Sequence, residues 1–176
     1  MDRLVTTHIS DEKGGSLSLS RLYYGVDYYP EHRSVKEYQD DLKLLSEAGI
    51  SAVRMGEFAW HELEPKEGEF RFEWMEKAIN DLGERGIFTV LCTPTASPPV
   101  WLSHKYPETV YQPENGVQRP YGARRHYCPS NPKYLELSYI IAGKMAEHFK
   151  NNPYIVGWHI DNELAQESTG RCKCDG

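Results

Sequence analysis

The chain has 176 residues, a net charge of −6 and a charged fraction of 26%, which is the balance of a folded domain. This charge argues against nucleic acid and anionic membranes as partners, because phosphate binding needs concentrated Lys and Arg. No apolar run approaches the roughly 18 residues of a membrane-spanning helix, and the N-terminus lacks an apolar signal core. We therefore expect no nucleic-acid or membrane partner and a cytoplasmic location, where thiols stay reduced.

The chain begins with a polar segment, residues 1–20, that we expect to be a flexible leader. A β-prone run, Leu22–Tyr29, follows it and predicts the first strand. The next segment predicts a helix, because Ser34 and Glu37 have the spacing of a capping box. Gly49 marks the end of this helix, since glycine readily adopts the left-handed conformation found after a last helical turn.

Strands and helices then alternate along the rest of the chain. Three apolar runs predict strands, and two segments with helical spacing of apolar residues predict helices. The strands are Ile50–Met55, Ile87–Cys92 and Ile155–Ile160, and the helices are Phe72–Gly86 and Pro132–Lys150. Apolar strands that alternate with helices indicate βαβ units and a parallel sheet.

The connections differ at the two ends of the predicted strands. Turns before strands are tight, whereas the segments after strands are long and rich in polar and aromatic residues. This asymmetry is typical of a (β/α)8 TIM barrel, whose active site is built from the loops after its strands. Four strands make half a barrel, and a whole one needs roughly 250 residues. We expect an α/β fold in which residues 21–176 form the N-terminal half of such a catalytic domain, truncated after the fourth strand.

Aromatic residues are abundant, with 12 Tyr, 4 Trp and 5 Phe, and many lie in predicted loops. Tyr and Trp offer a flat apolar face with a polar edge, which suits sugars, although they also serve in ordinary packing. Trp101 follows "SPP" and could be a sugar platform or could pack its loop. A cis peptide bond at Pro98–Pro99 would turn Trp101 inward.

The fourth predicted strand ends in an unusual polar cluster, within "VGWHIDNELA". At the end of a barrel strand, Glu163 could act as a general acid. Glycoside cleavage needs such an acid and a second carboxylate. Asn162 could hydrogen-bond the sugar hydroxyl next to the reacting carbon. The alternative is that Asp161, Asn162 and Glu163 only cap the next helix.

The ends of the second and third predicted strands carry further candidates. Glu57, in "RMGEFAW", should point toward the same site. It could contact the sugar, or it could form an ion pair with Arg54 or Arg124. Cys92 lies on a wholly apolar strand, so we expect it to be a core residue.

Five blocks of sequence, taken together, resemble glycoside hydrolase family 42, the β-galactosidases. They occur in family order and read "YYGVDYYPEH", "VRMGEFAWHELEPKEGEFRFEW", "TPTASPPVWL", "GARRHYCPSNP" and "GWHIDNE". The resemblance implies a (β/α)8 barrel that hydrolyses terminal β-D-galactosides with retention of configuration. It also implies β-galactoside sugars as ligands and a homo-oligomer, a trimer, for the complete protein.

The resemblance assigns roles residue by residue. Glu163 matches the family's acid/base, Asn162 its invariant neighbour, and Arg124 the arginine that binds galactose in the first subsite. The family's nucleophilic glutamate lies on strand seven, outside this chain, so we expect the chain alone to be inactive. Two alternatives stay open: a related barrel glycosidase acting on another β-linked sugar, such as an arabinopyranoside or mannoside, and a non-catalytic carbohydrate-binding remnant.

Three cysteines match a metal site that some members of the family have. Cys128 lies in "HYC", and Cys172 and Cys174 lie in "CKCDG". The resemblance implies a structural zinc bound by four cysteines, one from "HYC" and three from a C-x-C-x-x-C run whose last member would be residue 177. Such a zinc would join the loops after the third and fourth strands. We expect no organic cofactor.

Overall fold

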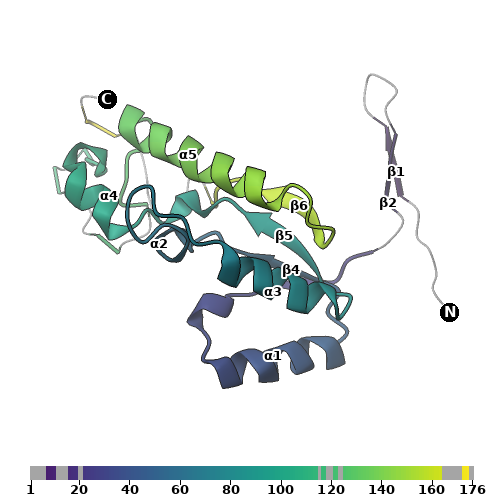
Figure 1. Cartoon of the computed structure of the whole chain (residues 1–176). Coiled ribbons are helices and arrows are strands. Elements are labelled where there is room, and N and C mark those ends of the chain that lie inside the picture. Colours follow the sequence, from purple (N-terminus) through teal and green to yellow (C-terminus); the bar gives the residue numbers. More distant parts are fainter. Residues whose placement is uncertain are drawn as a thin grey trace.

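The computed structural model describes residues 7–10, 16–19, 22–114, 116–117, 121–122, 125–163 and 172–174. Its centre is a four-stranded sheet with the order β3-β4-β5-β6 (Figure 1). The strands are β3 (Gly25–Asp27), β4 (Ala52–Met55), β5 (Phe88–Cys92) and β6 (Ile155–His159). Every neighbouring pair is parallel, which confirms the predicted parallel α/β architecture.

Three longer helices connect the strands: α1 (Val35–Glu47), α3 (Glu73–Gly83) and α5 (Pro132–Phe149). The predicted capping box of α1 is confirmed. The Ser34 hydroxyl accepts a hydrogen bond from the Glu37 backbone N–H at 3.3 Å, and the Glu37 carboxylate accepts one from the Ser34 backbone N–H at 2.8 Å. These bonds satisfy two backbone donors that a helix start would otherwise leave unpaired.

Short helices that were not predicted follow the strand ends. They are η1 (Pro30–His32), α2 (Trp60–Leu63), η2 (Pro94–Ala96), α4 (Val100–Lys105) and η3 (Pro107–Thr109). Segments of three to six residues are too short to show helical periodicity, which is why the sequence pattern did not identify them. In the described part of the chain, no helix has both the length and the apolar character needed to cross a bilayer.

The first strand of the sheet is shorter than the predicted run Leu22–Tyr29. Regular pairing covers only Gly25–Asp27, although the Ser51 N–H still donates to the Tyr24 carbonyl at 2.8 Å. Gly25 lies so close to β4 that a Cβ atom would stand 2.8 Å from the Ala52 carbonyl oxygen. Glycine is therefore required here by the close approach of two backbones.

A two-stranded antiparallel ladder occurs within the first 20 residues, where no strand was predicted. It joins β1 (Thr7–Ser10) to β2 (Ser16–Leu19). The flexibility of this leader, and the division of the chain at residue 21, stay predictions.

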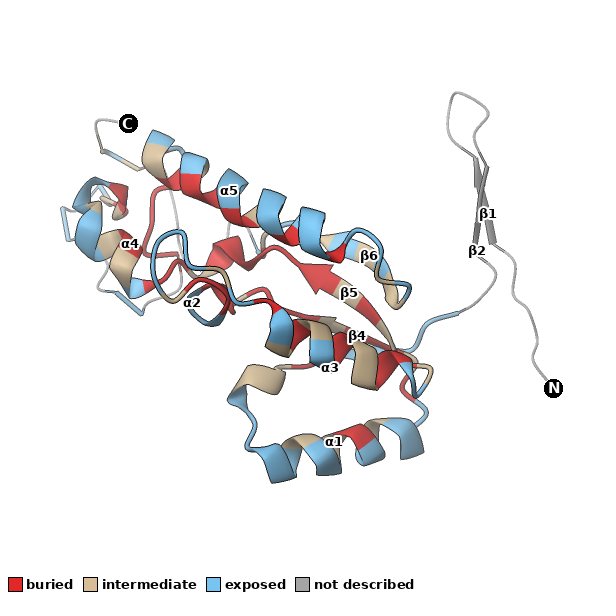
Figure 2. Ribbon diagram, viewed as in Figure 1, coloured by how far each residue is buried: buried red, intermediate tan, exposed pale blue. Residues whose placement is uncertain are grey.

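Apolar residues fill the space between the sheet and its helices. Figure 2 shows buried residues along β5 and on the sides of α3 and α5 that face the strands. Met55, Leu91, Ile79, Leu82 and Ile141 are all completely buried. Helix α1 contributes only one buried residue, Leu42, so it is the most loosely attached of the three longer helices.

Gly83 makes a close contact that should limit substitution. A Cβ atom at this position would lie 2.0 Å from Cγ of Tyr154, just before β6. We expect Gly83→Ala to reduce the free energy of unfolding by about 1–3 kcal/mol, because Tyr154 or α3 must move. Urea denaturation followed by circular dichroism measures this change.

Gly143 in α5 is the matched control, since nothing lies within 4 Å of a Cβ atom there. Gly143→Ala should stabilise the chain by up to about 1 kcal/mol, because alanine is the better helix former. Equal effects of the two substitutions would contradict the steric argument.

Candidate active site

Charged and polar side chains meet where the four strands end. Because parallel strands all end at the same edge of a sheet, Asp27 on β3, Arg54 on β4 and His159 on β6 lie side by side. Arg54 is the centre of this group. Its Nε and Nη2 atoms donate to the two Asp27 carboxylate oxygens at 2.7 and 2.9 Å, and its Nη1 atom lies 3.3 Å from His159 Nδ1. The paired guanidinium lowers the pKa of Asp27, which stays ionised.

Arg54 also contacts two of the four predicted sugar-binding residues, Glu57 and Asn162. Its Nη2 atom lies 3.0 Å from Glu57 Oε1, and its Nη1 atom donates to Asn162 Oδ1 at 3.1 Å. The bond from Arg54 to Asn162 therefore joins residues that are 108 positions apart in the chain. The sequence analysis did not identify this central role, although a charged residue inside the apolar run "AVRM" is unusual.

Glu57 is completely buried. Besides its ion pair with Arg54, it accepts a hydrogen bond from the Tyr29 hydroxyl at 2.9 Å. Burial and this bond to Glu57 raise the pKa of Tyr29 to about 12. The structure thus realises the expected pairing of Glu57 with Arg54, whereas a contact between Glu57 and a sugar stays a prediction.

Cys92 is fully buried, as expected, and faces the same charged group. Its Sγ atom lies 3.5 Å from His159 Nδ1. Burial, followed by the neighbouring Glu57 carboxylate, raises the pKa of the Cys92 thiol to about 12. This thiol therefore stays protonated at neutral pH and acts as a packing residue and weak donor.

Asn162 and Glu163 follow β6 on a turn with unusual backbone geometry. Asp161 and Glu163 have φ angles of 58° and 45°, in the left-handed region that non-glycine residues seldom occupy. Asn162 is 8% exposed, and because its Oδ1 accepts from Arg54, its Nδ2 amide group is oriented to donate elsewhere. Glu163 is exposed at the end of this turn. The arrangement places an amide donor beside a carboxyl group at the edge where a barrel active site lies.

The loop that contains Arg125 and Tyr127 contacts the turn after β6. Arg125, which is 5% exposed, donates from Nη1 to the Tyr127 hydroxyl at 2.8 Å, and the same atom lies 3.7 Å from Asp161 Oδ2. His126 Nε2 lies 3.1 Å from the Ser103 hydroxyl. Arg124, the predicted galactose-binding arginine, lies outside the described residues, so its role stays a prediction.

Trp101 packs its loop. Its indole N–H donates to the Glu64 carbonyl at 2.8 Å, and its ring contacts the buried core. The Pro98–Pro99 peptide bond is trans, because no described bond is cis, so the proposed inward turn through a cis bond is wrong. Trp101 also lines an open hollow of about 840 Å³ with Lys66, Glu67, Val100, His104 and Lys105. A sugar contact at Trp101 stays a prediction.

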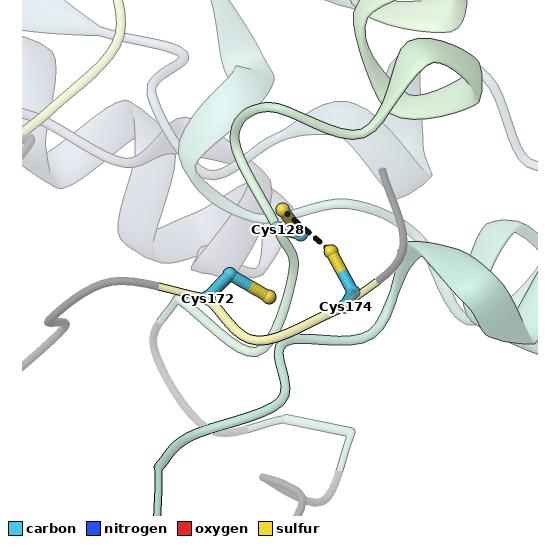
Figure 3. Close-up of side chains that lie close together, drawn as sticks. All are labelled: Cys128, Cys172 and Cys174. Carbon is cyan, nitrogen blue, oxygen red and sulfur yellow. Dashed lines mark hydrogen bonds between the residues drawn. The ribbon is translucent and has the colours of Figure 1, made fainter.

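The three predicted metal ligands come together in space (Figure 3). The Sγ atoms of Cys128, Cys172 and Cys174 all lie within 4.8 Å of one another, and those of Cys128 and Cys174 are 3.3 Å apart. Backbone bonds support the cluster, because Gln112 N–H donates to Cys172 Sγ at 3.3 Å and Lys173 N–H donates to the Gln112 carbonyl at 2.8 Å.

The thiols differ in acidity. Burial, and then the hydrogen bond between the Cys128 and Cys174 thiols, raise the pKa of Cys128 to about 12. Burial acts to raise the pKa of Cys172 as well, but the Gln112 N–H and the neighbouring thiols outweigh it and lower that pKa. Tetrahedral zinc at Zn–S distances of about 2.3 Å would separate its sulfur ligands by about 3.8 Å, so the cluster fits this ion with small movements.

A family model described as β-galactosidase, glycoside hydrolase 42, matches residues 27–176 of the chain. Among curated proteins, β-galactosidase BbgII of Bifidobacterium bifidum is 42% identical over 144 residues, which is 82% of this chain and 21% of that protein. A β-galactosidase of Thermus thermophilus is 43% identical over 150 residues, which is 85% of this chain and 23% of that protein.

The fold is similar to a solved β-galactosidase as well. The polyextremophilic enzyme of the Antarctic haloarchaeon Halorubrum lacusprofundi superposes with a TM-score of 0.82 at 41% identity, over 88% of this chain and 23% of that one. This agrees with the prediction of the N-terminal part of a TIM-barrel enzyme. The chain spans little more than a fifth of the length of these relatives.

Proposed function

Because the chain belongs to the glycoside hydrolase family 42 β-galactosidases, we propose that it forms the acid/base part of a retaining enzyme that cleaves terminal β-D-galactosides. The complete enzyme is a chain that also includes the regions its relatives have beyond this segment. The observation that carries the proposal is the turn after β6, where Arg54 orients the Asn162 amide next to Glu163.

In the proposed reaction, Glu163 donates a proton to the glycosidic oxygen as the bond to the leaving group breaks. The Asn162 amide donates to the sugar hydroxyl beside the anomeric carbon. Retention needs a carboxylate nucleophile about 5–5.5 Å from the acid. Arg54 holds Asp27 and Glu57 in ion pairs, so neither is available as the nucleophile. We therefore assign the nucleophile to a part of the complete enzyme that lies outside this 176-residue segment. That nucleophile bonds to the anomeric carbon as the leaving group departs. Glu163 then takes a proton from the water that attacks this carbon, breaks the bond to the nucleophile and releases galactose.

A panel of nitrophenyl glycosides tests the substrate class. We expect the complete enzyme to hydrolyse the β-galactoside fastest and to release β-galactose first, as seen by proton NMR. Faster hydrolysis of the β-arabinopyranoside or β-mannoside would favour the related-glycosidase alternative. No hydrolysis of any sugar by the complete enzyme would favour the non-catalytic alternative.

We further propose that Cys128, Cys172 and Cys174 hold a structural zinc ion, with a fourth ligand from outside the chain. Three sulfur atoms within 4.8 Å of one another support this proposal. Zinc there would tie the 125–128 loop, which carries Arg125, to the segment after Glu163. It would act as a support for the site and not as a reactant.

Metal analysis of the complete enzyme tests this site. We expect one zinc per chain by mass spectrometry, a loss of most of it in Cys172→Ser, and a lower melting temperature after chelation, because metal binding contributes to folding. The control is Cys92→Ala, which removes a thiol outside the cluster and should keep the zinc. Full zinc content in Cys172→Ser would contradict the assignment.

The compartment and the assembly also stay proposals. We propose a cytoplasmic enzyme, since a reducing compartment keeps zinc-binding thiols available, and a homotrimer, as the family resemblance implies. Light scattering of the complete enzyme measures its mass, and a monomer would contradict the trimer.

A further inference from the structure

The unusual backbone positions of the chain gather beside Glu163. Among the described residues, the non-glycine residues with positive φ are Arg125 at 54°, Asp161 at 58° and Glu163 at 45°. Such conformations cost of order 1 kcal/mol or more each, and they persist where surrounding contacts hold them. Two of the three residues form an ion pair with each other, which suggests that one contact maintains both turns.

Both carboxylate oxygens of Asp161 have partners. Oδ1 accepts from the Asn162 backbone N–H at 2.7 Å, and Oδ2 faces Arg125 Nη1 at 3.7 Å. The Asp161 N–H itself donates to the Thr93 hydroxyl at 2.8 Å. The turn that presents Asn162 and Glu163 is therefore held by the segment after β5 on one side and by Arg125 on the other.

Arg125 is itself firmly placed. Its side chain is 6% exposed, and it donates to the Tyr127 hydroxyl at 2.8 Å. The Tyr127 ring stacks on Tyr134 of α5 at 4.3 Å between ring centres, and the Tyr134 hydroxyl donates to the Thr95 carbonyl at 2.8 Å. These contacts connect Arg125 to helix α5 and to the loop after β5, so the position of its guanidinium is fixed.

We infer that Arg125 is a positioning residue for the acid/base: through its ion pair with Asp161 it holds the left-handed turn that aims Glu163 at the glycosidic oxygen. This inference rests on the proposed function. Arg125 touches no reacting atom in this scheme. It acts through Asp161, in contrast to its neighbour Arg124, for which the family resemblance implies a direct sugar contact.

The test uses leaving-group dependence in the complete enzyme. A displaced acid should harm substrates with poor leaving groups most, because good leaving groups need little protonation. We expect Arg125→Met to lower kcat/KM at least tenfold more for alkyl and unsubstituted phenyl β-galactosides than for the dinitrophenyl galactoside. Arg125→Lys, which keeps the charge, should recover part of this loss.

Asp161→Asn provides the second variant, because asparagine tolerates positive φ and keeps an oxygen for the Asn162 N–H while losing the charge. It should give the same leaving-group pattern. Adding Arg125→Met to it should increase the difference between leaving groups only a little, since both substitutions remove the Arg125–Asp161 contact. The control Arg71→Lys alters an exposed ion pair with Glu69 of 3.2 Å and should leave the pattern unchanged.

A uniform loss across all leaving groups, or additive losses in the double variant, would overturn the positioning role. Failure of both Arg125→Met and Asp161→Asn to fold would also overturn it in favour of a purely structural pair.

If wild-type enzyme is active but Glu163→Gln shows no leaving-group pattern, the proposed role of Glu163 fails, and this inference fails with it. A pattern in Glu163→Gln without one in the Arg125 variants would refute only the inference.

Discussion

Glu163→Gln in the complete enzyme should slow the cleavage of lactose by about 10²- to 10⁴-fold, the usual contribution of a general acid. Glutamine has nearly the same shape as glutamate, so the turn after β6 should keep its conformation while losing the proton donor. Activated aryl galactosides should lose much less in the first step, because a good leaving group departs without protonation. The kcat/KM values on lactose and on dinitrophenyl galactoside give the two losses, because kcat/KM reports the first step and excludes the later step in which Glu163 acts as a base.

Glu136→Gln is the matched control for this substitution. Glu136 is an exposed residue of α5 that pairs with Lys133 at 2.6 Å, and it lies on a helix outside the candidate site. We expect its kinetics to equal those of the wild type. Equal losses of activity on both substrates in Glu163→Gln would contradict the role of Glu163 as the general acid. Such a result would indicate a general disturbance of the site.

Arg54→Met should strongly reduce the free energy of unfolding. The fully buried Glu57 carboxylate would lose its cationic partner. Breaking a buried ion pair in this way typically costs about 3–5 kcal/mol, because the remaining charge is left without compensation. Asn162 and Asp27 would lose hydrogen bonds to the same guanidinium. Urea denaturation of the chain measures the change.

A double variant separates charge from packing in this prediction. Adding Glu57→Gln to Arg54→Met removes the uncompensated charge, so part of the lost stability should return. Arg71→Met is the control, because its exposed pair with Glu69 should contribute at most about 1 kcal/mol. A loss in Arg54→Met no greater than in Arg71→Met would contradict the central role of Arg54.

Much of the fold followed from local sequence patterns. Apolar runs such as Ile87–Cys92 predicted parallel strands, and the spacing of Ser34 and Glu37 predicted a helix start that the structure confirms. The short helices α2 and α4 escaped prediction because they are held by tertiary contacts, such as the bond from Trp101 to the Glu64 carbonyl, and not by periodicity.

The candidate site divides in a similar way. The polar strand end with Asn162 and Glu163 is visible in the sequence, and so is the set of three cysteines that the structure brings within 4.8 Å. The partners of these residues are not visible there. Nothing in local sequence indicates that Arg54 reaches Asn162, or that Arg125 meets Asp161, because each pair is far apart along the chain.

Local sequence patterns specify the order of strands and helices and the residue types available for chemistry, because apolar periodicity and helix caps act over a few neighbouring residues. Which charges are paired depends on the packing of distant segments. The register of four parallel strands places Arg54 among Asp27, Glu57 and Asn162. The burial of Glu57 depends on this long-range packing. The residues next to Glu57 in the sequence do not show whether its carboxylate is buried or exposed.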